Sequence, residues 1–210
     1  MSEPIVTPDY WERACAHLMK KDRVMRRLVP KFGELRLESR GDAFVTLARS
    51  VVGQQISVKA AQTVWDRFQA QMRRVTPGAV LKLDVDAMRA SGLSARKVEY
   101  LQDLSKHFAD KRVHVKDWSG MDDEAIIEEL VAIRGIGRWT AEMFLIFHLM
   151  RPDVLPVDDV GLINGVSRLY FSEEAVSRSE LREVAQAWAP YRSVATWYIW
   201  RSLDPQPVAY

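Results

Sequence analysis

Hydrophobic side chains recur at intervals of three and four residues along most of the chain, which is the spacing of a helix with one buried face. The clearest stripes lie within residues 42–52, 57–72, 94–108 and 122–131. No segment alternates polar and apolar residues as a half-buried strand would, and no internal repeat is present. The pattern therefore predicts an all-α protein.

Several stripes begin after a residue that can cap a helix. Ser57 and Ser94 precede two of them, Ser179 precedes another near the C-terminus, and Thr7-Pro8 has the form of a cap followed by proline at the first helical position. The caps and stripes together predict a series of short and medium-length helices joined by brief turns.

The stretch from residue 122 to residue 150 is interrupted by Gly135-Ile136-Gly137. The two glycines can adopt positive φ angles, while Ile136 can point inward and fix a turn between two helices. Such a hairpin exposes the amides at the start of its second helix, and these suit a phosphate oxygen. On the Gly-x-Gly pattern alone, an ordinary helical corner is the better interpretation.

A loop bracketed by Pro152 and Pro156 follows the hairpin and leads to two adjacent carboxylates, Asp158 and Asp159. Adjacent residues do not share a face, so a pair sharing one proton is disfavoured. One aspartate can cap the helix that begins at about Val160, while the other points into a cleft. Two solvated loop aspartates are the alternative, and it is weaker directly after this hairpin.

The pattern I-x-G-I-G-x-x-T-A, followed by an apolar helix and by V-D-D, resembles the helix-hairpin-helix DNA glycosylases. Within that superfamily, G-R-W-T-A at 137–141, Y-R-S at 191–193 and I-W at 199–200 are most similar to the bacterial and fungal alkylbase (3-methyladenine) DNA glycosylases. The likeness runs from about residue 41 to residue 203. It implies a monofunctional enzyme that hydrolyses the N-glycosidic bond of alkylated bases.

The same resemblance implies a single glycosylase domain of two interlocked helical lobes with a cleft between them. One lobe is expected over residues 41–155, including the hairpin at 122–150, and the other over residues 1–40 and 156–210. The cleft is expected to hold the hairpin and Asp159.

By resemblance, Asp159 matches the catalytic position, and Asp158 is then the candidate cap. A carboxylate near a helix N-terminus is favoured in its ionised form. Cleavage of an N-glycosidic bond develops oxocarbenium character on the sugar, which a fixed carboxylate stabilises while helping to activate water.

Position 139 separates two kinds of glycosylase. Hairpin glycosylases that also nick the strand carry a lysine there, whose amine forms a Schiff base with the sugar. This chain has Trp139, which predicts base excision without lyase activity. Trp139 and Trp200 match pocket aromatics of the family, suited to a cationic purine. Two further pocket positions, tyrosine in some relatives, are Met143 and Val160.

DNA contacts are also implied by the resemblance. An extruded base leaves a gap in the duplex, and the matching wedge positions are Gln55 or Ser57 in the turn after residue 53. The hairpin contributes the amides of Gly135 and Gly137 as a phosphate clamp, and the flanking Arg134 and Arg138 as phosphate contacts. The turn can also be a simple connection with a serine cap.

A monovalent cation, Na⁺ or K⁺, is implied at the hairpin, held by the backbone carbonyls of Val131, Ile133 and Ile136 and bridging to a phosphate. Backbone ligands leave almost no side-chain signature, so this ion is carried by the resemblance alone. No cofactor is required for the hydrolysis itself.

Composition changes this picture little. The 210 residues are 48% hydrophobic and 28% charged, typical of a globular protein, and the net charge of +2 requires any DNA-binding potential to be local. The single cysteine, Cys15, excludes both an internal disulfide and a four-cysteine iron–sulfur cluster. Four scattered histidines lack zinc-ligand spacing. With neither a membrane-length apolar run nor a signal peptide, we expect a cytoplasmic protein, associated with the nucleoid when bound to double-stranded DNA. We expect a monomer, since one enzyme acting on one lesion needs no symmetry.

Two other functions compete with alkylated-base excision. A non-catalytic helix-hairpin-helix protein would bind DNA with Asp159 in a structural role, and an excision assay on methylated DNA separates the two. A glycosylase for oxidised or mismatched bases is disfavoured by Trp139 and by the missing cluster cysteines. The preferred alkylated base is left open.

Overall fold

The computed structural model describes residues 7–39 and 42–203. Within these ranges the chain forms twelve α-helices and three short 3-10 helices and no β-strand, so the predicted all-α fold is confirmed. No helix in the described ranges is long and apolar enough to cross a membrane.

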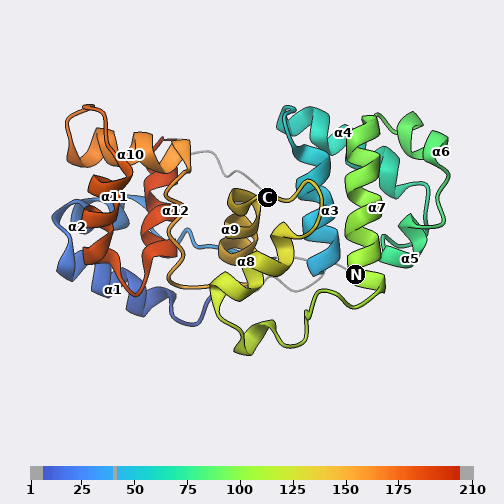
Figure 1. Ribbon diagram of the computed structural model, residues 1–210. Coiled ribbons are helices and arrows are strands. Elements are labelled where there is room, and N and C mark those ends of the chain that lie inside the picture. The colour runs from blue at the N-terminus through green and yellow to red at the C-terminus, as the bar shows by residue number, and fades with distance from the viewer. Residues whose placement is uncertain (1–6, 40–41, 204–210) are drawn as a thin grey trace. The chain divides into compact units, whose positions relative to one another are not determined.

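The helices group into two compact units (Figure 1). Unit 1 comprises residues 1–40 and 145–210, and unit 2 comprises residues 41–144. The division after residue 144 differs from the expected one after residue 155. The reason is that the intervening residues contact unit 1: Tyr10 Oη donates to the carbonyl of Met150 at 2.7 Å, and the amide of Val154 donates to Ser193 Oγ at 2.9 Å.

Unit 1 is built around helix α12 (Arg192–Leu203), which contacts α1 (Trp11–Lys21), α2 (Arg23–Leu28) and α10 (Val160–Tyr170). Seven consecutive residues of α12, from position 193 to position 199, are buried, so this helix is covered on all sides. The 3-10 helix η1 (Val29–Phe32), α11 (Arg178–Ala185) and the 3-10 helix η3 (Gln186–Trp188) complete the unit (Figure 1).

Unit 2 is arranged around α7 (Ala95–Ala109), which lies between α3 (Ala43–Gly53) on one side and the short α5 (Pro77–Val80) and α6 (Val85–Ala90) on the other (Figure 1). Helix α4 (Val58–Gln69) packs on α3. The 3-10 helix η2 (Trp118–Gly120) precedes α8 (Asp123–Val131), and the unit ends within α9 (Arg138–Phe147).

The capping residues were predicted with mixed success. Ser57 and Ser94 cap α4 and α7 as expected. Thr7-Pro8 does not begin a helix: α1 starts at Trp11 without a side-chain cap. Ser179 also proves wrong, because Ser177 caps α11 in a capping box with Glu180, whose carboxylate accepts from the Ser177 amide at 2.8 Å.

Gly165 allows α10 and α12 to approach closely. A Cβ at this position would overlap the side chain of Ile199, which is fully buried in α12. The backbone of Gly165 is helical, so its small volume and not its conformational freedom is what the contact uses.

Replacing Gly165 with alanine should therefore lower the free energy of unfolding by about 1–3 kcal/mol, the usual cost of overpacking a core. Gly78→Ala is the matched control, because a Cβ there has open space and the change should be neutral or slightly stabilising. Urea unfolding measures both. Equal unfolding free energies for the two variants would contradict this account of the helix contact.

Candidate functional site

Asp159 is the N-cap of α10. Its Oδ1 accepts hydrogen bonds from the amide of Leu162 at 2.6 Å and from the indole Nε1 of Trp200 at 2.8 Å. The residue is only 8% exposed. The two donors hold this carboxylate in one orientation at the start of α10.

Trp200 is itself held in place by stacking on Phe147, with ring centroids 5.6 Å apart and an interplanar angle of 14°. Its indole edge faces Gly161, where a Cβ would lie 3.3 Å from Trp200 Nε1 and 3.2 Å from Asp159 Oδ1. Trp200 was expected as a base-stacking aromatic, and the structure adds that it orients the carboxylate. Gly161 was not singled out from the sequence, because its importance comes from the close approach of another helix.

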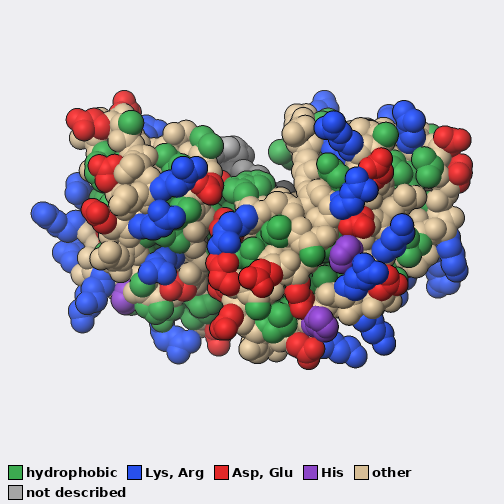
Figure 2. Space-filling model, in the orientation of Figure 1, with side chains coloured by type: hydrophobic (Ala, Val, Ile, Leu, Met, Phe, Trp, Pro, Cys, Tyr) green, Lys and Arg blue, Asp and Glu red, His purple; other side chains and the backbone are tan. Residues whose placement is uncertain are grey.

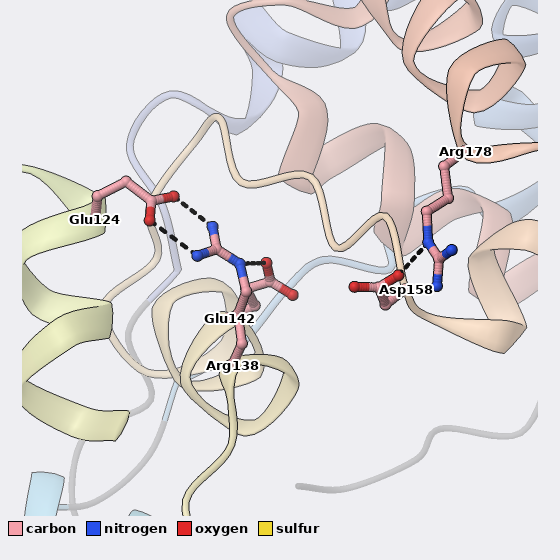
Figure 3. A network of polar contacts seen from close by, with 5 residues as sticks. All are labelled: Glu124, Arg138, Glu142, Asp158 and Arg178. Carbon is pink, nitrogen blue, oxygen red and sulfur yellow. Dashed lines mark hydrogen bonds and ion pairs between the residues drawn. The ribbon is translucent and has the colours of Figure 1, made fainter. Parts of the chain in front are cut away.

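Asp158 does not cap the helix, contrary to the expectation. Its side chain is 54% exposed and forms an ion pair with Arg178 at the start of α11 (Figure 3). The cap and the predicted catalytic acid are therefore the same residue, Asp159. The reason is local: only a residue with extended backbone immediately before the first helical turn places its side-chain oxygen over the N–H groups, and Asp159 has φ −74° and ψ 116°.

The hairpin forms between α8 and α9, as predicted, although α9 ends at Phe147 and not at residue 150. Ile136 is 3% exposed and points into the core. Only Gly135 has positive φ, at +86°, whereas Gly137 lies in an ordinary conformation with open space around it. The amide of Ile136 donates to the carbonyl of Ile133 at 3.1 Å, which closes the turn.

Helix α7 and the turn after α3 hold this hairpin from within unit 2. The ring of Tyr100 lies where a Cβ of Gly135 would be, so only glycine fits against it. Asp103 Oδ2 accepts from the amide of Arg134 at 2.8 Å, and Gln54 Nε2 donates to the carbonyl of Gly135 at 2.8 Å. Sequence reasoning missed these three supporting residues, because each acts across a long separation in the chain.

Both arginines expected to contact phosphate are paired with carboxylates. Arg134 lies 3.2 Å from Glu99, while Arg138 bridges Glu124 and the buried Glu142, the latter at 3.0 Å (Figure 3). The hydrogen bond from Arg138 lowers the pKa of Glu124. If Arg134 is to meet a phosphate, only its exposed ion pair with Glu99 has to open, which costs no more than about 1 kcal/mol. Arg138 is held more firmly, because one of its two partners, Glu142, is buried.

The expected wedge turn has a defined geometry. Gln55 is exposed and adopts φ +59°, a left-handed conformation rare for a residue with a side chain. Ser57 Oγ is used as a cap, accepting from the amide of Ala60 at 3.3 Å. Lys97 Nζ donates to the carbonyl of Val52 at 2.7 Å and fixes the end of α3. The turn therefore exposes the side chain of Gln55, whereas the hydroxyl of Ser57 caps α4.

The four residues expected to line a base pocket differ in accessibility. In unit 2, Trp139 is 41% exposed at the first turn of α9, whereas Met143, one turn later, is packed in the core at 6%. In unit 1, Val160 is 67% exposed and Trp200 partly buried. Trp139 and Val160 thus offer apolar surface, whereas Met143 offers almost none.

The carbonyls of Val131, Ile133 and Ile136 are neutral oxygen donors of the kind that a hard monovalent cation prefers. The Ile133 carbonyl accepts one amide and retains a second lone pair, so the set is chemically compatible with such an ion. Within the described ranges, no group of three or more His, Cys, Asp or Glu side chains could hold a metal.

Comparison with known proteins gives consistent relatives. A model of the HhH-GPD superfamily of base excision DNA repair proteins matches residues 48–190. DNA-3-methyladenine glycosylase 1 of Schizosaccharomyces pombe is 33% identical over 197 residues, covering 90% of this chain and 86% of the relative.

Two solved structures share the fold. The Schizosaccharomyces pombe 3-methyladenine DNA glycosylase Mag1 in complex with abasic DNA superposes with a TM-score of 0.80 at 32% identity, over 90% of this chain and 96% of that one. The DNA-3-methyladenine glycosidase of Bacillus halodurans gives 0.84 at 33% identity, over 96% and 93%.

The dual position of Asp159 predicts how two substitutions differ in stability. Asn is as good an N-cap as Asp, so the free energy of unfolding of Asp159→Asn should lie within about 0.5 kcal/mol of the wild-type value. Asp159→Ala removes the cap and leaves the Leu162 amide and the Trp200 indole without their shared acceptor, so it should cost about 1–3 kcal/mol. Chemical denaturation measures both; equal stability of the two variants would refute the capping role.

Proposed function

Because the chain belongs to the HhH-GPD superfamily of base excision DNA repair proteins, we propose that it is a DNA glycosylase that excises alkylated bases of the 3-methyladenine type. The observation that carries the proposal is the carboxylate of Asp159, fixed by two donors at the start of α10 and following a helical hairpin in the chain. The names of the relatives support the same substrate class.

In the proposed reaction, the bond between C1′ of the sugar and the base nitrogen breaks, and the oxygen of a water molecule bonds to C1′. The positive charge that develops on the sugar is stabilised by ionised Asp159, which also orients the water and accepts its proton. An alkylated base that carries a positive charge leaves as a neutral molecule. It therefore needs no acid to protonate it, which suits a site supplied with one carboxylate.

Trp200 acts in this scheme as a positioning residue, since its indole N–H holds Asp159 Oδ1. Trp139 offers exposed indole surface on which an extruded cationic base can stack, an attraction of about 2 kcal/mol when desolvated. Val160 adds apolar surface beside the carboxylate at the start of α10. We assign Met143 no direct contact with the base, because its side chain is buried.

The DNA contacts that we propose come from the hairpin and the wedge turn. The exposed backbone at Gly137 can approach a phosphate closely, and the carbonyls of Val131, Ile133 and Ile136 would hold a monovalent cation that adds positive charge there. Gln55, which is exposed, is the better wedge candidate than Ser57, whose hydroxyl caps α4. One chain supplies every group, so we expect a monomer that acts on chromosomal DNA in the cytoplasm.

The decisive variant is Asp159→Asn. It retains the cap, and so it should leave the fold and DNA affinity intact while lowering single-turnover excision from a methylated duplex at least about a hundredfold, roughly 3 kcal/mol of transition-state stabilisation. Asp158→Asn is the matched control: it removes a charge from the neighbouring residue but breaks only an exposed ion pair.

A wild-type excision rate for Asp159→Asn together with an inactive Asp158→Asn would show that Asp159 is not the catalytic acid and that Asp158 is. Wild-type rates for both variants would exclude the proposed mechanism, and a wild-type protein that binds DNA without excising any methylated base would reduce the function to binding.

Strand cleavage by lyase chemistry would require an amine where this chain has Trp139. Without an amine at this position, treatment with sodium borohydride during turnover should trap no covalent protein–DNA adduct, because no Schiff base forms. A lyase-active glycosylase that carries the lysine serves as the positive control. An adduct formed by the present chain at a comparable yield would show that another amine attacks the sugar.

A further inference from the structure

A strongly basic segment in unit 1 takes no part in the site described above. Residues 20–31, from the end of α1 through α2 into η1, include six exposed cationic side chains: Lys20, Lys21, Arg23, Arg26, Arg27 and Lys31. Figure 2 shows Lys and Arg side chains gathered at this end of the molecule, over α1 and α2. A protein whose net charge is only +2 thus concentrates positive charge on one short stretch.

The only carboxylate of this segment is turned inward. Asp22 is 7% exposed, and its Oδ1 accepts from the amides of Val24 and Met25 at 2.7 and 2.9 Å. Its Oδ2 accepts from Tyr170 Oη at 2.8 Å and from Trp188 Nε1 at 3.0 Å. Four hydrogen bonds within the core account for this charge, so it does not neutralise the exposed cations next to it in the sequence.

The segment leads to a cavity of about 280 Å³ within unit 1. Its cationic side chains are Lys31, Arg168 of α10 and Arg201 of α12, and its apolar wall includes Leu28, Phe32 and Leu169. The guanidinium of Arg201 lies over the ring of Trp197, 4.9 Å from its centroid, which holds that charge at the cavity. Among the described residues that line the cavity, none is acidic.

These cations differ from the arginines of the hairpin. Arg134 and Arg138 both have carboxylate partners, whereas the part of the chain that the structure describes contains no ion pair for Lys31, Arg168 or the cations of residues 20–27. Interaction with helix C-termini explains why a single cation sits at the end of α10 or α12. It does not explain why Lys31 of η1 and Arg168 of α10 reach the same cavity, each without a carboxylate partner among the residues that the structure describes.

We propose that this basic segment and its cavity bind phosphates of the DNA backbone, as a second contact separate from the hairpin. The inference rests on the proposed function only in taking DNA as the partner. Arg168 follows Asp159 by nine residues of α10, roughly 13 Å along the helix axis. At about 3.4 Å per nucleotide along one strand, the contact would fall a few nucleotides from the target base.

The test compares two double variants that remove the same charge. Lys31→Gln/Arg168→Gln removes two cavity cations, and Arg13→Gln/Arg182→Gln removes two exposed arginines elsewhere in unit 1. Fluorescence anisotropy on an undamaged duplex is measured over a range of salt concentrations, and single-turnover excision is measured at saturating enzyme. Each lost phosphate contact lowers the slope of log affinity against log salt by about 0.9.

The cavity variant should therefore lose about 2 units of this slope and bind roughly tenfold more weakly at low salt, with saturated excision unchanged. The same slope in both double variants would overturn the proposal. It would also be overturned if inorganic phosphate, titrated at fixed ionic strength, raised the melting temperature of the wild type but not of the cavity variant while duplex binding stayed the same. A wild type that binds through the cavity yet excises nothing would refute the proposed function alone.

Discussion

Oδ1 of Asp159 joins the beginning of α10 to the end of α12. It accepts from the backbone of Leu162 in one helix and from the indole of Trp200 in the other. Two glycines of α10 make this close contact possible. Gly161 leaves room for the carboxylate and the indole, and Gly165 leaves room for Ile199. Because α12 is buried on all sides, it can pack this closely against α10 only where α10 carries almost no side chain.

The hairpin is supported in a different way, through its backbone. A carboxylate from α7 takes one amide of the turn, an amide side chain from the turn after α3 takes one carbonyl, and an aromatic ring fills the space beside Gly135. Gln54 therefore connects the two segments proposed to meet DNA, one at the hairpin and one at the wedge. Because its partner is a main-chain atom, the connection does not depend on the side chains that flank Gly135.

The helices and the hairpin could be predicted from the sequence because their signals are local. The stripe from Ser94 onward and the break at residues 135–137 depend only on neighbouring residues. The pairing of Arg138 with Glu124 was not predictable, since Glu124 lies 14 residues away on another helix. The contact from Gln54 to Gly135 spans 81 residues and exists only after the helices have packed. The roles of Asp158 and Asp159 turned on the backbone angles of one residue, which no pattern of residue types fixes.

The cap at position 159 also constrains how this chain can diverge. One carboxylate terminates a helix and, in the proposed mechanism, performs the chemistry, so folding and activity restrict the same atom. A lineage that gave up the reaction would still have to begin α10, and the residues that begin helices well are few: Asn, Ser and Thr beside Asp. A descendant that lost the catalytic activity would therefore still carry a helix-capping residue at this position, and it could retain both its fold and its affinity for DNA.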